Sequence, residues 1–340
     1  DPKTEKCWLV EGYKLHSWDG AKWSTTDLER GLAHERLTGT KYLFPLILKE
    51  KELYYQKGDK WEILKRPAHI SEFRDYFRAR LRDKKGNLWL PSDDNKSLIR
   101  FDGRDWASFS IPINAGNVPR EEQFFVSAMA EDEMGNIWMG DSDGRLLRFK
   151  VKDKSWKNIS LSNLESDFSL SPQTMTPDNK GHFWMVGDGT VYKVEDTIVA
   201  RFKRENIDTL NFNYAYFSPD AICVDAKDRL WAAPQEYLYN YDGQKWQIVD
   251  TDEYAGFFAD ELGGMMALNT DGELKVFDRN LKNISTAFLT DGRIWETTFL
   301  QDAQKNIWIS TRNDNRAYGL FKISPDGKLF EFEESTCPIF

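Results

Sequence analysis

Hydrophobic and polar residues alternate with a period of two along most of the chain. Examples are the segments Leu146-Leu-Arg-Phe149, Val191-Tyr-Lys-Val194 and Leu274-Lys-Val-Phe277. Successive side chains of a strand point to opposite faces, so this pattern predicts half-buried β-strands. No stretch carries a convincing helical stripe. The sequence therefore predicts an all-β fold.

An acidic turn followed by an aromatic or apolar residue recurs along the chain. Six segments share it: Asp83–Trp89, Asp132–Trp138, Asp178–Trp184, Asp225–Trp231, Asp260–Met266 and Asp302–Trp308. The Asp side chain can bond back to nearby backbone amides, and Gly or Asn three residues later tolerates the positive φ of a tight hairpin. Trp or Met then starts the next strand.

A second pattern, an aromatic residue followed by Asp-Gly-x-x-Trp, lies downstream at residues 18–23, 101–106 and 241–246. Residues 46–61 align without a gap onto 231–246, which adds a unit that lacks the acidic turn. The anchors are then residues 8, 46, 89, 138, 184, 231, 266 and 308. Such units have room for four antiparallel strands each and predict a β-propeller. Eight blades are favoured, and seven remain the alternative because unit two lacks its turn.

We expect one propeller domain over residues 1–340. The first unit begins almost at its acidic turn, so residues 335–340 are expected to supply its missing inner strand and close the ring. Cys7 and Cys337 would then lie on neighbouring strands, which predicts a Cys7–Cys337 disulfide. The alternative is three unrelated thiols, and Cys223 is a core residue in either case. The approximate blades are 1–33 plus 335–340, 34–70, 71–118, 119–165, 166–208, 209–250, 251–288 and 289–334.

These units resemble the two-component-regulator propeller repeat, whose hallmark is an Asp-x-x-Gly-Asn-x-Trp turn followed by a Gly-Leu-x-x-Tyr-like strand. Asp83–Trp89 and Asp132–Trp138 match the turn, and Gly144–Phe149 follows the second copy. The resemblance covers nearly the whole chain, although blades two and seven depart from the pattern. It implies a periplasmic or extracellular ligand-sensing domain, in a family that often responds to carbohydrates.

The net charge and the composition of the chain limit the classes of partner that it can bind. The formal net charge is −9, which repels phosphate backbones and argues against nucleic acid. No apolar run approaches the roughly 20 residues that a membrane helix needs, so we expect no membrane span in this chain. The chain begins Asp1-Pro2-Lys3, which favours a mature form or an excised ectodomain.

Known catalytic and cofactor motifs are missing. The four His residues lack the spacing of a zinc site, and no phosphate loop or dinucleotide fingerprint is present, so we expect no metal and no cofactor. The acidic loops at residues 92–95 and 141–144 are better explained as hairpin turns than as calcium sites. Paired carboxylates for glycoside hydrolysis remain open among 55 acidic residues, and no catalytic residue is assigned.

Aromatic residues gather where each inner strand begins. Of the thirteen Trp, eleven fall on repeat positions and Trp18 aligns with Phe101 and Tyr241, so only Trp295 lies outside the register. In a propeller the segment that leads into an inner strand passes over one face near the channel, where loops commonly bind ligands. Aromatic faces and Arg donors suit a sugar or an anionic ligand, although these aromatics also suit a role as filling beneath the loops. The candidate ligand-binding residues are Arg74, Tyr76, Arg120, Phe124, Phe168, Tyr214, Tyr216, Tyr237, Tyr254, Trp295 and Arg312.

The sequence leaves three functions open. The first is an extracytoplasmic sensing domain that binds a small molecule, glycan or peptide at the channel-mouth face, with a protein as a further partner. The second is a polysaccharide lyase or glycoside hydrolase on a propeller scaffold. The third is a protein-interaction scaffold. Clustered aromatics favour the first over the third, and the shortage of His argues against the second.

Overall fold

Over the residues that it describes, the computed structural model contains eight antiparallel sheets and almost no helix, which confirms the predicted β-propeller and its count of eight blades. The structure describes residues 7–11, 14–19, 22–28, 37–38, 46–49, 51–57, 60–73, 80–114, 123–141, 145–159, 174–178, 180–187, 190–194, 198–202, 222–233, 237–259, 264–278, 280–290, 292–302, 304–313 and 318–332.

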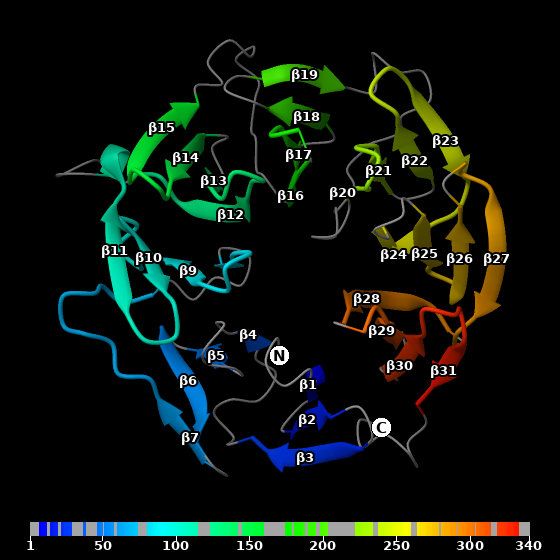
Figure 1. The fold of residues 1–340 in the computed structure, drawn as a ribbon, viewed down its shortest axis with the longest axis horizontal. Helices are drawn as coiled ribbons and strands as arrows, with labels where there is room; N and C mark the ends of the chain where they lie inside the picture. Colours follow the sequence, from blue (N-terminus) through cyan, green and yellow to red (C-terminus); the bar gives the residue numbers. More distant parts are fainter. Residues whose placement is uncertain are drawn as a thin grey trace. The chain divides into compact units, whose positions relative to one another are not determined.

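The chain divides into two compact units, residues 1–171 and 172–338, which hold four sheets each. Every sheet is a meander whose strands follow one another in chain order (Figure 1). In unit 1 the first sheet contains β1 (Cys7–Glu11), β2 (Lys14–Trp18) and β3 (Trp23–Asp27), and the second contains β4 (Leu37–Thr38), β5 (Leu46–Lys49), β6 (Glu52–Lys57) and β7 (Lys60–Ile63). The third contains β8 (Leu81–Arg82), β9 (Leu88–Pro91), β10 (Ser97–Phe101) and β11 (Trp106–Ser110), followed by the 3-10 helix η2 (Pro112–Asn114). The fourth contains β12 (Val126–Glu131), β13 (Ile137–Asp141), β14 (Leu146–Lys150) and β15 (Ser155–Ile159).

Unit 2 continues the same plan. The fifth sheet contains β16 (Thr174–Pro177), β17 (Phe183–Gly187), β18 (Thr190–Val194) and β19 (Ile198–Phe202). The sixth contains β20 (Ile222–Val224), β21 (Leu230–Ala232), β22 (Leu238–Tyr241) and β23 (Trp246–Asp250). The seventh sheet contains β24 (Tyr254–Ala259), β25 (Met265–Asn269), β26 (Glu273–Phe277) and β27 (Asn283–Phe288). The eighth contains β28 (Ile294–Gln301), β29 (Ile307–Asn313), β30 (Tyr318–Ile323) and β31 (Leu329–Glu331).

The first sheet has three described strands, while each of the other seven has four. Residues 335–340, which we expect to complete it, lie outside the described residues, as does Cys337. Cys7 begins β1, and its side chain is not among those described. The closing strand and the Cys7–Cys337 disulfide therefore stay predictions. Cys223, on β20, is half-buried and packs against a hydrophobic cluster of unit 2, as expected of a core residue.

The acidic turns owe their sequence to one buried carboxylate. In the fourth sheet, Asp132 Oδ1 accepts the backbone N–H of Asn136 at 2.8 Å, and Oδ2 accepts the indole N–H of Trp138 at 2.9 Å. Asp132 is only 3% exposed, so these bonds satisfy a charge that burial would otherwise penalise. The same Asp-to-Trp bond, at 2.8 to 2.9 Å, joins Asp83 to Trp89, Asp225 to Trp231 and Asp302 to Trp308.

In the five acidic turns that begin at residues 83, 132, 178, 225 and 302, the third residue after the Asp has positive φ. Gly86, Gly135 and Gly181 occupy it with φ of 75°, 76° and 85°, which confirms the predicted role of the glycine. The sixth and eighth sheets place Asp228 and Lys305 there, with φ of 59° and 66°. These two turns accept an unfavourable conformation for a residue with a Cβ atom, because the Asp bonds hold the hairpin closed.

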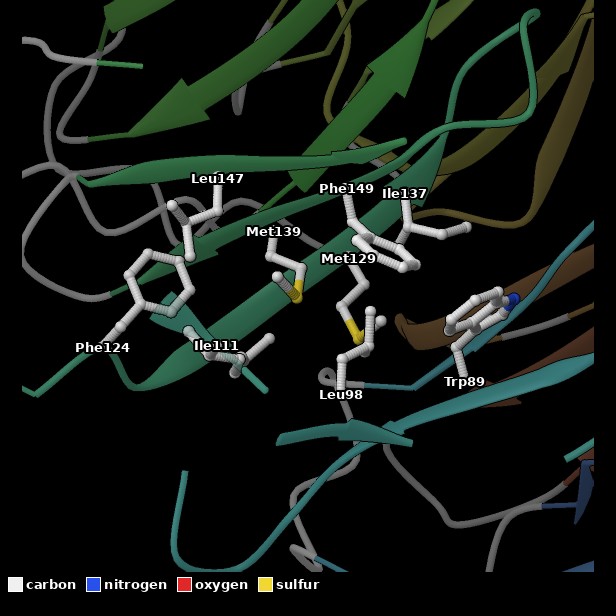
Figure 2. Packing of buried hydrophobic residues seen from close by; sticks show 10 residues of the cluster. Trp89, Leu98, Ile111, Phe124, Met129, Ile137, Met139, Leu147 and Phe149 are labelled. Atoms are coloured by element: carbon white, nitrogen blue, oxygen red, sulfur yellow. The ribbon is translucent and has the colours of Figure 1, made fainter. Parts of the chain in front are cut away.

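Large apolar side chains hold neighbouring blades together. A cluster between the third and fourth sheets shows the arrangement at close range (Figure 2). Each fully buried large apolar side chain contributes about 1.5–3 kcal/mol, so the aromatic anchors of the repeat stabilise blade against blade. The buried members of this cluster are Trp89, Leu98, Ile111, Phe124, Val126, Met129, Ile137, Met139, Leu147 and Phe149.

Candidate functional site

In unit 2, the segments that lead into β24 and β28 are joined through a single hairpin. The backbone N–H of Thr270 donates to Glu253 O at 2.8 Å, and the N–H of Ile294 donates to Thr270 O at 2.7 Å. Glu253 precedes β24, Ile294 begins β28, and Thr270 lies in the β25–β26 hairpin between them. We call residues 250–255, 269–273 and 292–296 the lead-in platform. Here two of the segments that lead into inner strands, those before β24 and β28, lie side by side, and both are among the described residues.

Both strands of the lead-in platform begin with a β-bulge. In β28, Ile294 pairs with Asn313 and Glu296 with Arg312, which leaves Trp295 as the extra residue. In β24, Tyr254 pairs with Asn269 and Gly256 with Leu268, which leaves Ala255. A bulge breaks the alternation of the pleat and redirects the side chains near it. The same irregularity opens β12, where Ser127 is the extra residue, so the bulge recurs among the inner strands and Trp295 differs by its residue type.

An ion pair ties the two lead-in segments together at the surface. Arg293 Nη2 donates to both carboxylate oxygens of Glu253, at 2.9 and 2.8 Å. The side chains are 51% and 45% exposed, so the pair contributes on the order of 1 kcal/mol or less. Together with the backbone bonds through Thr270, it forms a closed ring of contacts between the seventh and eighth blades.

Lys275 occupies a cage of carboxylates beside this platform. Its Nζ atom lies 2.9 Å from Asp250 Oδ2, 3.1 Å from Asp252 Oδ2 and 3.6 Å from Glu273 Oε2, and its side chain is only 14% exposed. Tyr254 closes the cage, because its hydroxyl donates to Asp250 Oδ2 at 2.9 Å. The cage fixes the direction in which the chain runs into β24.

The pKa values in the cage follow from burial and charge. Burial alone would lower the pKa of Lys275, but its bonds to Asp250 and Asp252 outweigh that effect and raise it. Burial raises the pKa of Tyr254 strongly, and the bond to the Asp250 carboxylate raises it further. Lys275 is therefore charged and Tyr254 neutral over the whole physiological range, so Tyr254 stays a hydrogen-bond donor.

Asn269 completes the polar framework. Its Nδ2 atom donates to Asp252 Oδ2 at 2.6 Å, and its Oδ1 atom accepts the backbone N–H of Glu273 at 2.7 Å. Asn269 is 3% exposed, so both of its functional groups are used in holding the hairpin under the start of β24. The lead-in platform is thus a preorganised surface rather than a loose pair of loops.

Four predicted ligand-binding residues besides Trp295 lie among the described residues. Tyr254 belongs to the cage, and Arg312 is half-buried on β29, opposite Glu296 of the lead-in platform. Tyr237 is half-buried in unit 2, with its ring 5.7 Å from that of Tyr239. Phe124 is fully buried in the cluster of Figure 2, beneath the guanidinium of Arg145, so the structure places it in the core.

Trp295 is described only through its backbone in β28. The other predicted residues lie outside the described residues, and their role stays a prediction. They are Arg74, Tyr76, Arg120, Phe168, Tyr214 and Tyr216.

Sequence reasoning missed the charged half of the lead-in platform. Asp250, Asp252 and Glu253 form an acidic run directly before Tyr254, which is the one local signal that pointed to them. Lys275 sits in an ordinary alternating strand, Leu274-Lys-Val-Phe277, and nothing in that pattern distinguishes it.

The histidines that the structure describes in detail have local partners. His182 Nδ1 lies 2.9 Å from Asp178 Oδ2 in the acidic turn of the fifth blade, and His16 Nδ1 lies 3.0 Å from Thr25 Oγ1. Burial, followed by the charge of Lys14, lowers the pKa of His16 to about 4. Within the described ranges, no three His, Cys, Asp or Glu side chains gather in a group that could hold a metal ion. The part of the chain described here also contains no helix long and apolar enough to cross a membrane.

Comparison with known proteins returns structural similarity alone. No protein-family model and no curated protein sequence matches the chain. A catalytically inactive virginiamycin B lyase from Staphylococcus aureus, solved with quinupristin, aligns over 93% of this chain and 97% of its own, with 11% identity and a TM-score of 0.53. YCF48 from Cyanidioschyzon merolae aligns over 78% of this chain and 88% of its own, with 13% identity and a TM-score of 0.50.

Extracellular domains of regulatory systems are also among the similar structures. That of the putative hybrid two-component system BT3049 from B. thetaiotaomicron shares 14% identity and a TM-score of 0.52 over 98% of this chain. That of BT4673, described as a putative one-component system, shares 13% identity and a TM-score of 0.53 over 99%. The chain spans about half the length of both, 51% in each case. At such identities these similarities establish the propeller fold and leave the function open.

Proposed function

We propose that this chain is an extracytoplasmic sensing domain that binds a small molecule or glycan at the face where its inner strands begin. The lead-in platform of the seventh and eighth blades is the proposed site, with Tyr254, Trp295 and Arg312 as its predicted contacts. The observation that carries the proposal is the pair of bulges at Ala255 and Trp295, on two segments held together by the Thr270 bonds and the Glu253–Arg293 pair. Backbone irregularities of this kind concentrate at binding and catalytic sites.

The charges of the platform favour an uncharged, hydroxyl-rich ligand over an acidic one. Six acidic residues belong to the platform, and three basic residues lie on or beside it, which gives a net charge of −3 (3 − 6). Lys275 and Arg293 are already paired with carboxylates. An anionic ligand would meet repulsion here, whereas sugar hydroxyls can donate to carboxylate oxygens. The six acidic residues are Asp250, Asp252, Glu253, Asp271, Glu273 and Glu296, and the three basic ones are Lys275, Arg293 and Arg312.

Similar extracellular domains of regulatory systems make a sensing role the natural expectation for such a platform. The lyase and scaffold alternatives make different predictions in the same experiment. A lyase or hydrolase consumes its ligand, and an interaction scaffold binds no small ligand at all.

A thermal-shift screen against neutral oligosaccharides, sugar acids and small anions tests the proposal. We expect a neutral oligosaccharide to raise the melting temperature, to be recovered unchanged, and to lose its effect in Trp295→Ala. Phe288→Ala is the matched control, because Phe288 is an exposed aromatic on the outer strand of the seventh blade. A hit that survives Trp295→Ala would move the site elsewhere. Turnover of the hit would make the chain an enzyme, and the absence of any hit would contradict the proposal.

A further inference from the structure

The inner strands β24 and β28 approach each other closely at a single glycine. A Cβ atom on Gly256 would lie less than 3.0 Å from the Thr297 methyl carbon Cγ2, which is closer than real Cβ contacts come. Gly256 is buried, and its φ does not fall in the left-handed region, so the backbone itself would accept another residue. The glycine is therefore required by the neighbouring strand and not by its own conformation.

Thr297 is not free to move away from this contact. Its hydroxyl donates to the backbone carbonyl of Ser310 at 3.0 Å, which fixes the side-chain rotamer that directs the methyl group at Gly256. Phe258 and Phe299 stack one layer further along the same two strands, with ring centroids 6.3 Å apart and an interplanar angle of 15°. An added methyl group at position 256 would have to separate the strands rather than push aside a flexible side chain.

Gly256 and Thr297 lie next to the two bulges. Gly256 directly follows Ala255, the bulge residue of β24, and Thr297 follows Trp295 by two residues in β28. The spacing of the strands at this contact therefore sets the spacing of the two bulged segments beside it. The same spacing is needed for the bond that the N–H of Ile294 donates to Thr270 O, because this bond joins the two blades.

We propose that Gly256 is the positioning residue of the lead-in platform. Its contact with Thr297 holds the lead-in segments of the seventh and eighth blades at one separation, so that they form one binding surface instead of two independent loops. This inference rests on the proposed function, since it assigns the geometry of the same site. It predicts that a change at position 256 weakens ligand binding without touching the ligand.

The matched variants are Gly256→Ala, Thr297→Ser and the double variant. Gly256→Ala introduces the overlap with the Thr297 methyl group. Thr297→Ser removes that methyl group but keeps the hydroxyl that bonds to Ser310 O. The double variant therefore restores the space at the contact while retaining the anchoring bond. Rescue by this one methyl deletion would show that the overlap with Thr297 causes the effect of Gly256→Ala.

Amide hydrogen exchange gives a readout that needs no ligand. We expect Gly256→Ala to speed exchange at the Ile294 amide, which bonds across the two blades, by about tenfold or more relative to amides of β17 and β18, and the double variant to restore protection. Uniform acceleration across unit 2, or no rescue by Thr297→Ser, would overturn the positioning role. Because this measurement is made on the unliganded chain, it stands even if the ligand screen fails.

Binding of a neutral oligosaccharide from the screen supplies the second readout. Gly256→Ala should weaken its affinity by about tenfold, and the double variant should bring the affinity back to within about threefold of the wild type. Unchanged affinity together with accelerated exchange would refute the link between the contact and the site. The absence of any bound oligosaccharide would refute the proposed function and with it the role of Gly256 in binding.

Discussion

Asp132 is the residue whose replacement best tests why the acidic turn recurs. Asp132→Asn keeps the size of the side chain and an oxygen that can still accept the backbone N–H groups of Met134 and Asn136. It places an NH2 group where Oδ2 now accepts from the indole of Trp138 and the amide of Asn136. The Asn136 amide can rotate to offer its oxygen, but an indole N–H cannot become an acceptor.

The expected loss follows from these contacts. Trp138 is 1% exposed, so its N–H would be left buried without an acceptor, which costs about 1–3 kcal/mol. Bonds to a charged acceptor are worth about 1.5–3 kcal/mol each, and part of that value also disappears with the charge. We therefore expect Asp132→Asn to lower the free energy of unfolding by about 3 kcal/mol.

Urea denaturation, followed by tryptophan fluorescence and far-UV circular dichroism, measures this loss. Trp138→Phe and the double variant complete a cycle, in which a coupling of about 1–2 kcal/mol is expected between the carboxylate and the indole. Asp178→Asn is the control, because Trp184 Nε1 has no hydrogen-bond partner in the described part of the fifth blade. A loss within about 0.5 kcal/mol for Asp132→Asn, or a coupling near zero, would refute the reasoning.

Three further predictions concern charge and covalent linkage. Burial raises the pKa of Glu131, so the folded chain binds this proton more tightly than the unfolded chain, and the resulting stability is lost as the pH rises through the folded pKa. Glu131→Gln should thus gain stability over the wild type near pH 7 and lose that gain near pH 4 in thermal melts; a gain independent of pH contradicts this. Lys275→Met should cost about 2 kcal/mol at neutral pH, because three carboxylates lose their counter-charge, and less at acidic pH in the same melts. Peptide mapping without reductant should find Cys7 joined to Cys337, and Cys337→Ser should then lower stability by about 2–4 kcal/mol; separate peptides would disprove the disulfide.

The strands, the hairpin turns and the repeat were determined by interactions between residues close together in the sequence. The period of two predicts strands because pleat geometry acts on neighbouring residues. The acidic turns predict hairpins because Asp, Gly and Trp act within seven residues of one another, as the Asp132–Trp138 bond shows. The eight anchors follow from the repetition of this local unit and favour eight blades. The structure decided against seven, because the second unit forms a sheet although it lacks the acidic turn.

The lead-in platform was decided by tertiary structure. Trp295 stood out in the sequence because it breaks the repeat register, but only the pairing of β28 with β29 identifies it as a bulge residue. The sequence around Phe124 does not show whether this aromatic side chain is buried or exposed. Its burial depends on the packing of two blades against each other. Lys275 meets Asp250 across 25 residues of chain, and Gly256 meets Thr297 across two blades. Such contacts depend on register and on the spacing of strands distant in sequence, and a local pattern carries no information about either.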